Sequence, residues 1–317
     1  MKKNKKLGCI SLLMFSPFAM AMQPMDDQNL SETTGQSGIS VGVNVSNVQV
    51  NQASMIDRDG LGSTVSDTNS ASLVIAGNDA SAVANQSFNV SFIGTQNNKS
   101  VMNFVVDTDG GSGKPFANIA MGFGSDITGV KISPFALYLA SAAASSNPTT
   151  STSVFTGTNK TAGVIKILSL SNGLDINFNT SKPVFNLQMG NAPQNRMITF
   201  GGAIQSICAS GTGCAISLLS DDSSVGANFN FQLNATDPIN GFSLKGFYAG
   251  VDPSGFIFGN TGASSKFDVS LNNVIMGTAT NVNPTGSAFA GIQNGPMGNF
   301  GAIGTSVTDL KVRISGL

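Results

Sequence analysis

The chain has 317 residues, of which 41% are hydrophobic and only 10% charged, and its formal net charge is −1. This length and apolar content are enough to bury a core, which excludes a disordered protein. The charge balance offers no positive surface for nucleic acid, so we expect no nucleic-acid partner.

The first 21 residues have the pattern of a secretory signal peptide. Four lysines within the first six residues precede an apolar run, residues 7–18, and Ala19-Met20-Ala21 supplies a small-x-small cleavage site. A run of about twelve apolar residues is too short to cross a bilayer, which takes about twenty in a helix. We therefore expect cleavage between Ala21 and Met22, an exported mature chain with 12 basic and 17 acidic residues, and no integral membrane segment after cleavage.

The mature chain opens on a polar segment, residues 22–38. Residues 25–38 read MDDQNLSETTGQSG, and this opening resembles the mature N-terminus of the exported Gram-negative proteins named pilus assembly protein FilA, in which M/L-D-D-x-x-L-S-x-x-T-G-Q-x-G starts the chain. Residues 57–62 and the Asn- and Gly-rich body are similar to that family as well. The resemblance implies a secreted component of a surface fibre system and supplies no catalytic residue. The alternative is a recognition or maturation tag carried by unrelated exported chains.

Apolar residues recur with a period of two along the body, residues 39–317, which is typical of strands. The first stripe slips by one residue at Ser46-Asn47, a pattern that predicts a β-bulge. We interpret residues 39–50 as the first strand of the body or, alternatively, as a donor strand of a pilin-like subunit. Further stripes, bounded by Gly, Asn, Asp or Pro, cover residues 88–92, 102–106, 119–123, 135–139, 174–178, 185–189, 229–233, 267–271 and 310–314.

The polar positions between the apolar ones are filled by Ser, Asn, Gln and Thr, so one side of each sheet should be wet and the other packed. Abundant Gly, Asn, Ser and Thr also disfavour helices and favour turns. The sequence therefore predicts an all-β fold, an antiparallel β-sandwich or prism with Asn- and Gly-rich loops. A β-solenoid is the alternative, although its fixed short period is missing. Residues 141–152 and 277–304 are of low complexity and are interpreted as surface loops.

The body contains a degenerate internal repeat around 114–132, 182–190 and 229–244. Residues 114–122 recur at 182–190 with five identities in nine positions, and a shorter echo lies at 229–233. A duplicated strand-turn-strand unit is the simplest account, and coincidence in a chain built from few residue types is the alternative. The expected organisation is a signal peptide (1–21), an N-terminal motif segment (22–38) and a β body (39–317).

Two cysteines, Cys208 and Cys214, remain in the mature chain. Export into an oxidising space predicts a disulfide between them. The closed loop is short, so the chain-entropy estimate is only about 2 kcal/mol. We interpret the bond as a local clamp on a hairpin.

Two pairs of aspartates are candidates for chemistry. Asp57 with Asp59, and Asp107 with Asp109, have the Asp-x-Asp spacing of calcium loops but lack the remaining EF-hand ligands. Both pairs precede Gly at the end of an apolar run, so we interpret them as turn residues and as weak calcium candidates. A glycosidase pair is the remaining catalytic alternative. The chain has no histidine, which removes Ser/His/Asp and Cys/His systems and the usual zinc sites. We therefore expect no enzyme activity, cofactor or metal.

The functional expectation is an exported structural or assembly component of a pilus-like surface appendage, with a supporting role in adhesion. Its partners would be other pilus or surface-assembly proteins, or further copies of itself. Its location would be the periplasm, the outer-membrane surface or an extracellular fibre. The alternative is a secreted carbohydrate- or peptide-binding β module, because strand faces rich in Asn, Gln and Thr can donate and accept hydrogen bonds.

Overall fold

The computed structural model describes residues 38–60, 70–79, 81–94, 100–141, 153–191, 194–220, 226–277 and 295–315, the side chains of residues 295 and 296 excepted. The signal peptide, the Ala21-Met22 cleavage site, the N-terminal motif segment up to residue 37 and residues 142–152 lie outside these ranges. Within them every element is a strand except one 3-10 turn, Val83–Asn85, which confirms the all-β prediction. None of the elements in these ranges is a helix long and apolar enough to span a membrane.

The larger sheet consists of long antiparallel strands, five of which are interrupted near their middle. The halves of these five strands are β2 (Asn47–Val50) and β3 (Gln52–Asp57), β4 (Ala71–Gly77) and β5 (Phe88–Gly94), β8 (Ile127–Ile132) and β9 (Phe135–Ser141), β12 (Val164–Leu170) and β13 (Leu174–Phe178), and β16 (Ala203–Ile207) and β17 (Cys214–Leu219). Each half of one strand pairs with the adjacent half of the next strand. For example, β8 pairs with β13, and β9 pairs with β12. Each interruption is therefore a break in a strand that keeps its direction, not a hairpin turn.

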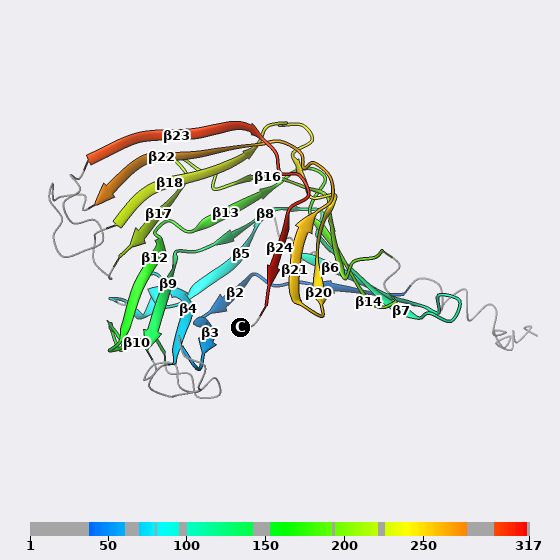
Figure 1. Cartoon of the computed structure of the whole chain (residues 1–317), viewed down its shortest axis with the longest axis horizontal. Coiled ribbons are helices and arrows are strands. Elements are labelled where there is room, and N and C mark those ends of the chain that lie inside the picture. Colours follow the sequence, from blue (N-terminus) through cyan, green and yellow to red (C-terminus); the bar gives the residue numbers. More distant parts are fainter. Residues whose placement is uncertain are drawn as a thin grey trace, which may run out of the picture. The chain divides into compact units, whose positions relative to one another are not determined.

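Three uninterrupted strands complete this sheet: β18 (Gly226–Ala235), β22 (Phe267–Gly277) and β23 (Gly295–Thr305). The short β19 (Phe242–Ser243) pairs with β16. Figure 1 shows the order from β23 and β22 through β18, β17, β12 and β9 to β4. The expectation of a loop throughout residues 277–304 is wrong for residues 295–304, because they pair with β22.

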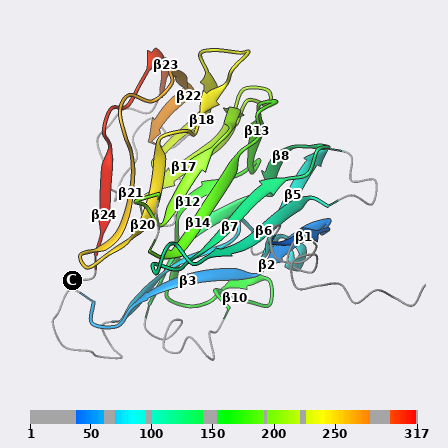
Figure 2. The same cartoon turned by 90° about the vertical axis from the view of Figure 1, so that its right-hand side faces the viewer.

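The second sheet has eight strands, and most of them enter it as hairpins between consecutive long strands of the first sheet. They are β1 (Ile39–Val43), β6 (Met102–Asp109), β7 (Phe116–Phe123), β14 (Val184–Gly190), β15 (Ile198–Gly201), β20 (Phe247–Asp252), β21 (Gly255–Asn260) and β24 (Lys311–Ile314). The hairpin β6–β7 separates β5 from β8, and β14–β15 separates β13 from β16. Neighbours in this sheet therefore follow chain order, as Figure 2 shows for β24, β21 and β20.

The chain passes from one sheet to the other at residues 44–46. The strand β1 ends at Val43 in the second sheet, and β2 begins at Asn47 in the larger one. The predicted β-bulge at Ser46-Asn47 is therefore wrong: the slip in the pattern marks a change of sheet. Ile39 to Val43 pair with β6 of the same chain, as the first-strand interpretation expects.

Two copies of the sequence repeat are neighbours in the second sheet. They lie in β7 and β14, which pair antiparallel with Ile119 opposite Leu187. The echo at residues 229–233 lies in β18 of the larger sheet. Two copies thus lie in the second sheet and the third lies in the larger sheet. The duplication stays a prediction.

A cluster of buried residues lies where a small hairpin, β10 (Phe155–Thr156) and β11 (Asn159–Lys160), packs on the larger sheet. The Phe155 ring meets Tyr138 edge-on, with 5.5 Å between the ring centroids. Small residues on the neighbouring strands, including Ala76 and Ala136, leave room for these rings. The Tyr138 hydroxyl donates to the Gly77 carbonyl at 2.7 Å. Burial raises the pKa of Tyr138 well above its usual value, so the hydroxyl stays a donor at physiological pH.

Tyr138→Phe is expected to lower the free energy of unfolding by about 1 kcal/mol, because it removes a buried hydrogen bond and leaves the packing in place. Urea denaturation measures the change. Tyr248→Phe is the matched control, because the Tyr248 hydroxyl has no hydrogen-bond partner among the described residues. Equal losses in the two variants would contradict the assigned hydrogen bond.

Candidate functional site

The aspartate pairs accept hydrogen bonds from nearby backbone. Asp57 Oδ1 accepts the Asp59 and Gly60 N–H groups at 3.2 and 3.0 Å, and Asp109 Oδ1 accepts the Gly111 N–H at 2.6 Å. Hydrogen bonding with the Asp59 side chain, and then with these backbone groups, lowers the pKa of Asp57. Both loops are thus arranged as Asx turns.

The two pairs belong to different sheets, because Asp57 ends β3 and the pair Asp107 and Asp109 ends β6. Over the described ranges no three residues of the types Asp, Glu, Cys and His gather as a metal-binding group. Calcium binding at these aspartates therefore stays a prediction.

The disulfide joins Cys208 to Cys214, with 5.1 Å between the Cα atoms. The sequence predicts that this bond clamps a hairpin, and that prediction is wrong. The strands β16 and β17 run in the same direction along one edge of β18. The loop between them accepts hydrogen bonds from Gln232 of β18 and Asn272 of β22, and the disulfide joins its two ends. A disulfide of this kind points to an oxidising, extracytoplasmic location.

The five breaks of the larger sheet lie side by side, and they form a polar line across it. At one break the Asn172 side chain replaces backbone pairing: its Nδ2 donates to the Gly213 carbonyl at 2.9 Å, and its Oδ1 accepts the Ala215 N–H at 2.7 Å. Gly173 follows with a φ of 74°, and a Cβ there would collide with the Ile132 carbonyl oxygen. The breaks are therefore built into the local sequence.

Two cavities lie along this break line. One, of about 340 Å³, is lined by Asn78, Ser133 and Ser171 among others, and the second, of about 470 Å³, includes Asn51. Both cavities share Ser87. The Asn78 Oδ1 atom is buried and has no hydrogen-bond partner among the described residues. The break line thus forms a polar groove, and its wall contains a buried acceptor without a partner among the described residues.

Each sheet also carries an unbroken apolar row. Across the second sheet, one apolar side chain from every strand stands opposite the next, so that eight strands contribute eight residues to one face. This row consists of Ile39, Val106, Ile119, Leu187, Ile198, Ala249, Phe258 and Val312. The corresponding row of the larger sheet consists of Ala53, Ile75, Leu137, Leu168, Leu218, Ala227 and Met276.

The two apolar faces meet only in part. Phe123 of β7 packs against Phe92 of β5 and Phe178 of β13, with ring centroids 6.4 and 4.5 Å apart. Elsewhere most of the apolar side chains are half-buried or exposed, although Ala227 and Ala249 are buried. Most of the phenylalanines on these faces remain accessible to solvent, whereas Phe155 on the opposite face of the larger sheet is buried.

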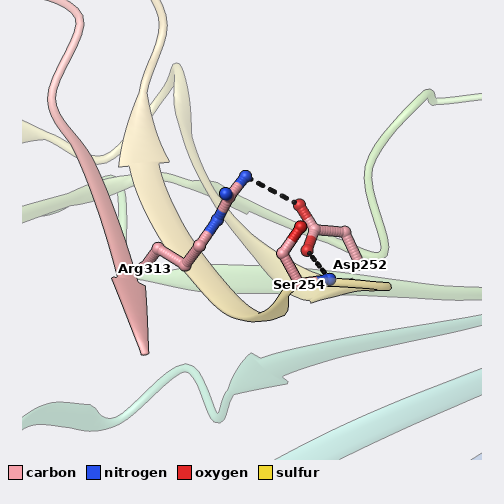
Figure 3. Close-up of polar contacts among 3 residues, drawn as sticks. All are labelled: Asp252, Ser254 and Arg313. Carbon is pink, nitrogen blue, oxygen red and sulfur yellow. Dashed lines mark hydrogen bonds and ion pairs between the residues drawn. The ribbon is translucent and has the colours of Figure 1, made fainter. Parts of the chain in front are cut away.

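The most exposed part of the second sheet's apolar face is a second row at its edge. Val251, Phe256 and Ile314 stand opposite one another on β20, β21 and β24, and are 68%, 42% and 63% exposed. We call them the exposed trio. On the opposite face of the same strands, Arg313 Nη2 lies 3.4 Å from Asp252 Oδ2, and Ser254 donates its N–H to Asp252 (Figure 3). One face of these strands is thus charged and the other apolar.

The sequence is similar to one family over its first third. Residues 1–109, about a third of the chain, match a family of unknown function (DUF6160). No curated protein and no solved structure matches the chain. The matched stretch runs to the end of β6 and includes residues 25–38 and 57–62. No named homologue supports the resemblance to pilus assembly proteins, and the match itself assigns no activity.

Proposed function

We propose that the mature protein is an exported structural or assembly component of a pilus-like surface appendage, and that it works by contact with other subunits rather than by catalysis. The observation that supports this proposal is the apolar row on each sheet, together with the exposed trio, Val251, Phe256 and Ile314, beside the row of the second sheet. The resemblance at residues 25–38 and the disulfide support an extracytoplasmic role.

Leaving such an apolar face in water costs free energy. Monomeric soluble proteins rarely expose contiguous apolar patches larger than a few hundred Å². Fully burying one Val, Ile or Phe side chain contributes about 1.5–3 kcal/mol. A subunit that covers the exposed trio therefore gains association energy from three side chains in one row.

Deletion of the gene tests the proposal in the cell. We expect the loss of surface fibres, of adhesion, or of both, because the appendage would lack a component. Complementation with the wild type should restore them. Complementation with a variant carrying Thr at Val251, Phe256 and Ile314 should restore them poorly, although the variant is exported. Fibres and adhesion unchanged by deletion would contradict the proposal.

A secreted carbohydrate- or peptide-binding module is the second candidate, and the polar groove along the break line favours it. Hydroxyl and amide side chains line both cavities, and the buried Asn78 Oδ1 has no donor among the residues that the structure describes. A glycan and peptide array measures this function. Binding that disappears in Asn78→Ala would support it, and no binding combined with self-assembly would favour the structural role.

A further inference from the structure

A pocket of about 370 Å³ on the second sheet has a different character from the break line. Its lining includes two cations, Arg196 and Lys245, and three aromatic residues, Phe200, Phe247 and Tyr248. Amide, hydroxyl and glycine residues form the rest, and no acidic residue lines it. In a mature chain with more acidic than basic residues, the pocket is a local concentration of positive charge.

The Arg196 side chain is stacked on an aromatic ring. Its Cζ atom lies 4.3 Å from the centroid of the Tyr248 ring, which is a cation–π contact. One nitrogen, Nη1, donates to the Asn195 carbonyl at 3.0 Å. Within the described ranges no acidic group pairs with Arg196 or Lys245. The remaining donors of Arg196 are therefore available to an anion.

The loop that carries Arg196 is held in place by Gln194. Its Nε2 atom donates to the carbonyls of Arg196 and Met197 at 2.8 and 3.1 Å. Its backbone N–H donates to Gln188 Oε1, and Thr199 Oγ1 donates to Gln194 Oε1, both at 3.1 Å. Arg196 is thus presented by a hydrogen-bonded loop rather than by a freely moving one.

We infer that this pocket binds a carboxylate-bearing sugar. A planar guanidinium group can hold a carboxylate through two parallel hydrogen bonds, and Lys245 adds a second positive charge. The Asn195 amide and the Thr261 hydroxyl also line the pocket, and these groups can bind the hydroxyls of a sugar ring. The inference does not depend on subunit assembly, because the pocket involves none of the exposed trio.

Isothermal titration calorimetry of the mature protein with trigalacturonic acid tests the assignment. We expect binding that Arg196→Ala weakens about tenfold or more, since it removes a hydrogen-bonded charge. The affinity of Arg196→Lys should lie between those of the wild type and Arg196→Ala, because lysine keeps the charge but cannot form two parallel hydrogen bonds. The exposed Lys131 of the other sheet is the matched control cation, and Lys131→Ala should leave the affinity unchanged.

Three further results would overturn the assignment. The first is the absence of binding, and the second is unchanged affinity in Arg196→Ala. The third is equal affinity for the methyl-esterified trisaccharide, which has no charge. Inorganic phosphate that binds as tightly as the sugar acid would overturn it as well, because a simple anion site would then be sufficient.

Discussion

Phe155→Ala is expected to lower the free energy of unfolding by about 3–5 kcal/mol. The ring is buried and packs edge-on against Tyr138. The residues beneath it, such as Ala76 and Ala136, are too small to fill the space that the ring would leave. The hairpin that carries Phe155 has strands of only two residues, so this contact and the buried Val154 provide most of its apolar attachment to the sheet.

Urea denaturation followed by circular dichroism measures the loss, and Phe300→Ala is the control. Phe300 is about half-exposed on β23, so its removal opens no enclosed cavity. If Phe155→Ala does not fold, Phe155→Leu should still fold with a loss of about 1 kcal/mol. Similar losses for the alanine variants of Phe155 and Phe300 would show that the hairpin does not cover a core.

Threonine at Val251, Phe256 and Ile314 together is expected to weaken self-association or subunit binding about tenfold or more, which corresponds to about 1.4 kcal/mol. Threonine suits a strand, so the sheet should be retained while apolar area is lost. The matched control lies on the opposite face of the same strands: Asp252→Asn with Arg313→Gln removes the ion pair drawn in Figure 3. Exposed ion pairs contribute little, so the control should associate like the wild type. Equal weakening in both variants would contradict an apolar interface.

Most of the strands that the sequence predicts have one face with polar side chains. Phe229, Phe231 and Leu233 alternate with polar residues, and β18 contains all three. The strand β4 was not predicted, because Val74 and Ala76 are buried beneath Phe155 while Leu73 and Ile75 line the other face. Both faces are then apolar, and the alternation disappears. The covering ring lies far along the chain, so no local pattern reports it.

The glycine-rich β23 was missed for another reason. Glycine disfavours strands, and local propensity therefore predicts a loop. Pairing with β22 overrides that propensity, with shifts of register that accommodate residues such as Gly298, whose φ is 94°. The pattern of β23 is set by its partner, not by its own composition.

The candidate sites differ in how far apart in the sequence the residues that form them lie. Asp57 and Asp109 sit in turns that the sequence predicts from neighbouring residues. The stacking of Arg196 on Tyr248 depends on the pairing of β15 with β20, where Thr199 stands opposite Tyr248. The apolar rows require the register of all eight strands of the second sheet. Neither arrangement can be predicted from residues that are neighbours in the sequence.

Sedimentation equilibrium of the mature protein over a wide concentration range tests the central claim most directly. Apolar faces that serve as subunit interfaces predict an average mass that rises with concentration above that of one chain, and a smaller rise for the threonine variant of Val251, Phe256 and Ile314. A mass equal to one chain at every concentration, together with no binding to proteins of the surface appendage, would contradict the account.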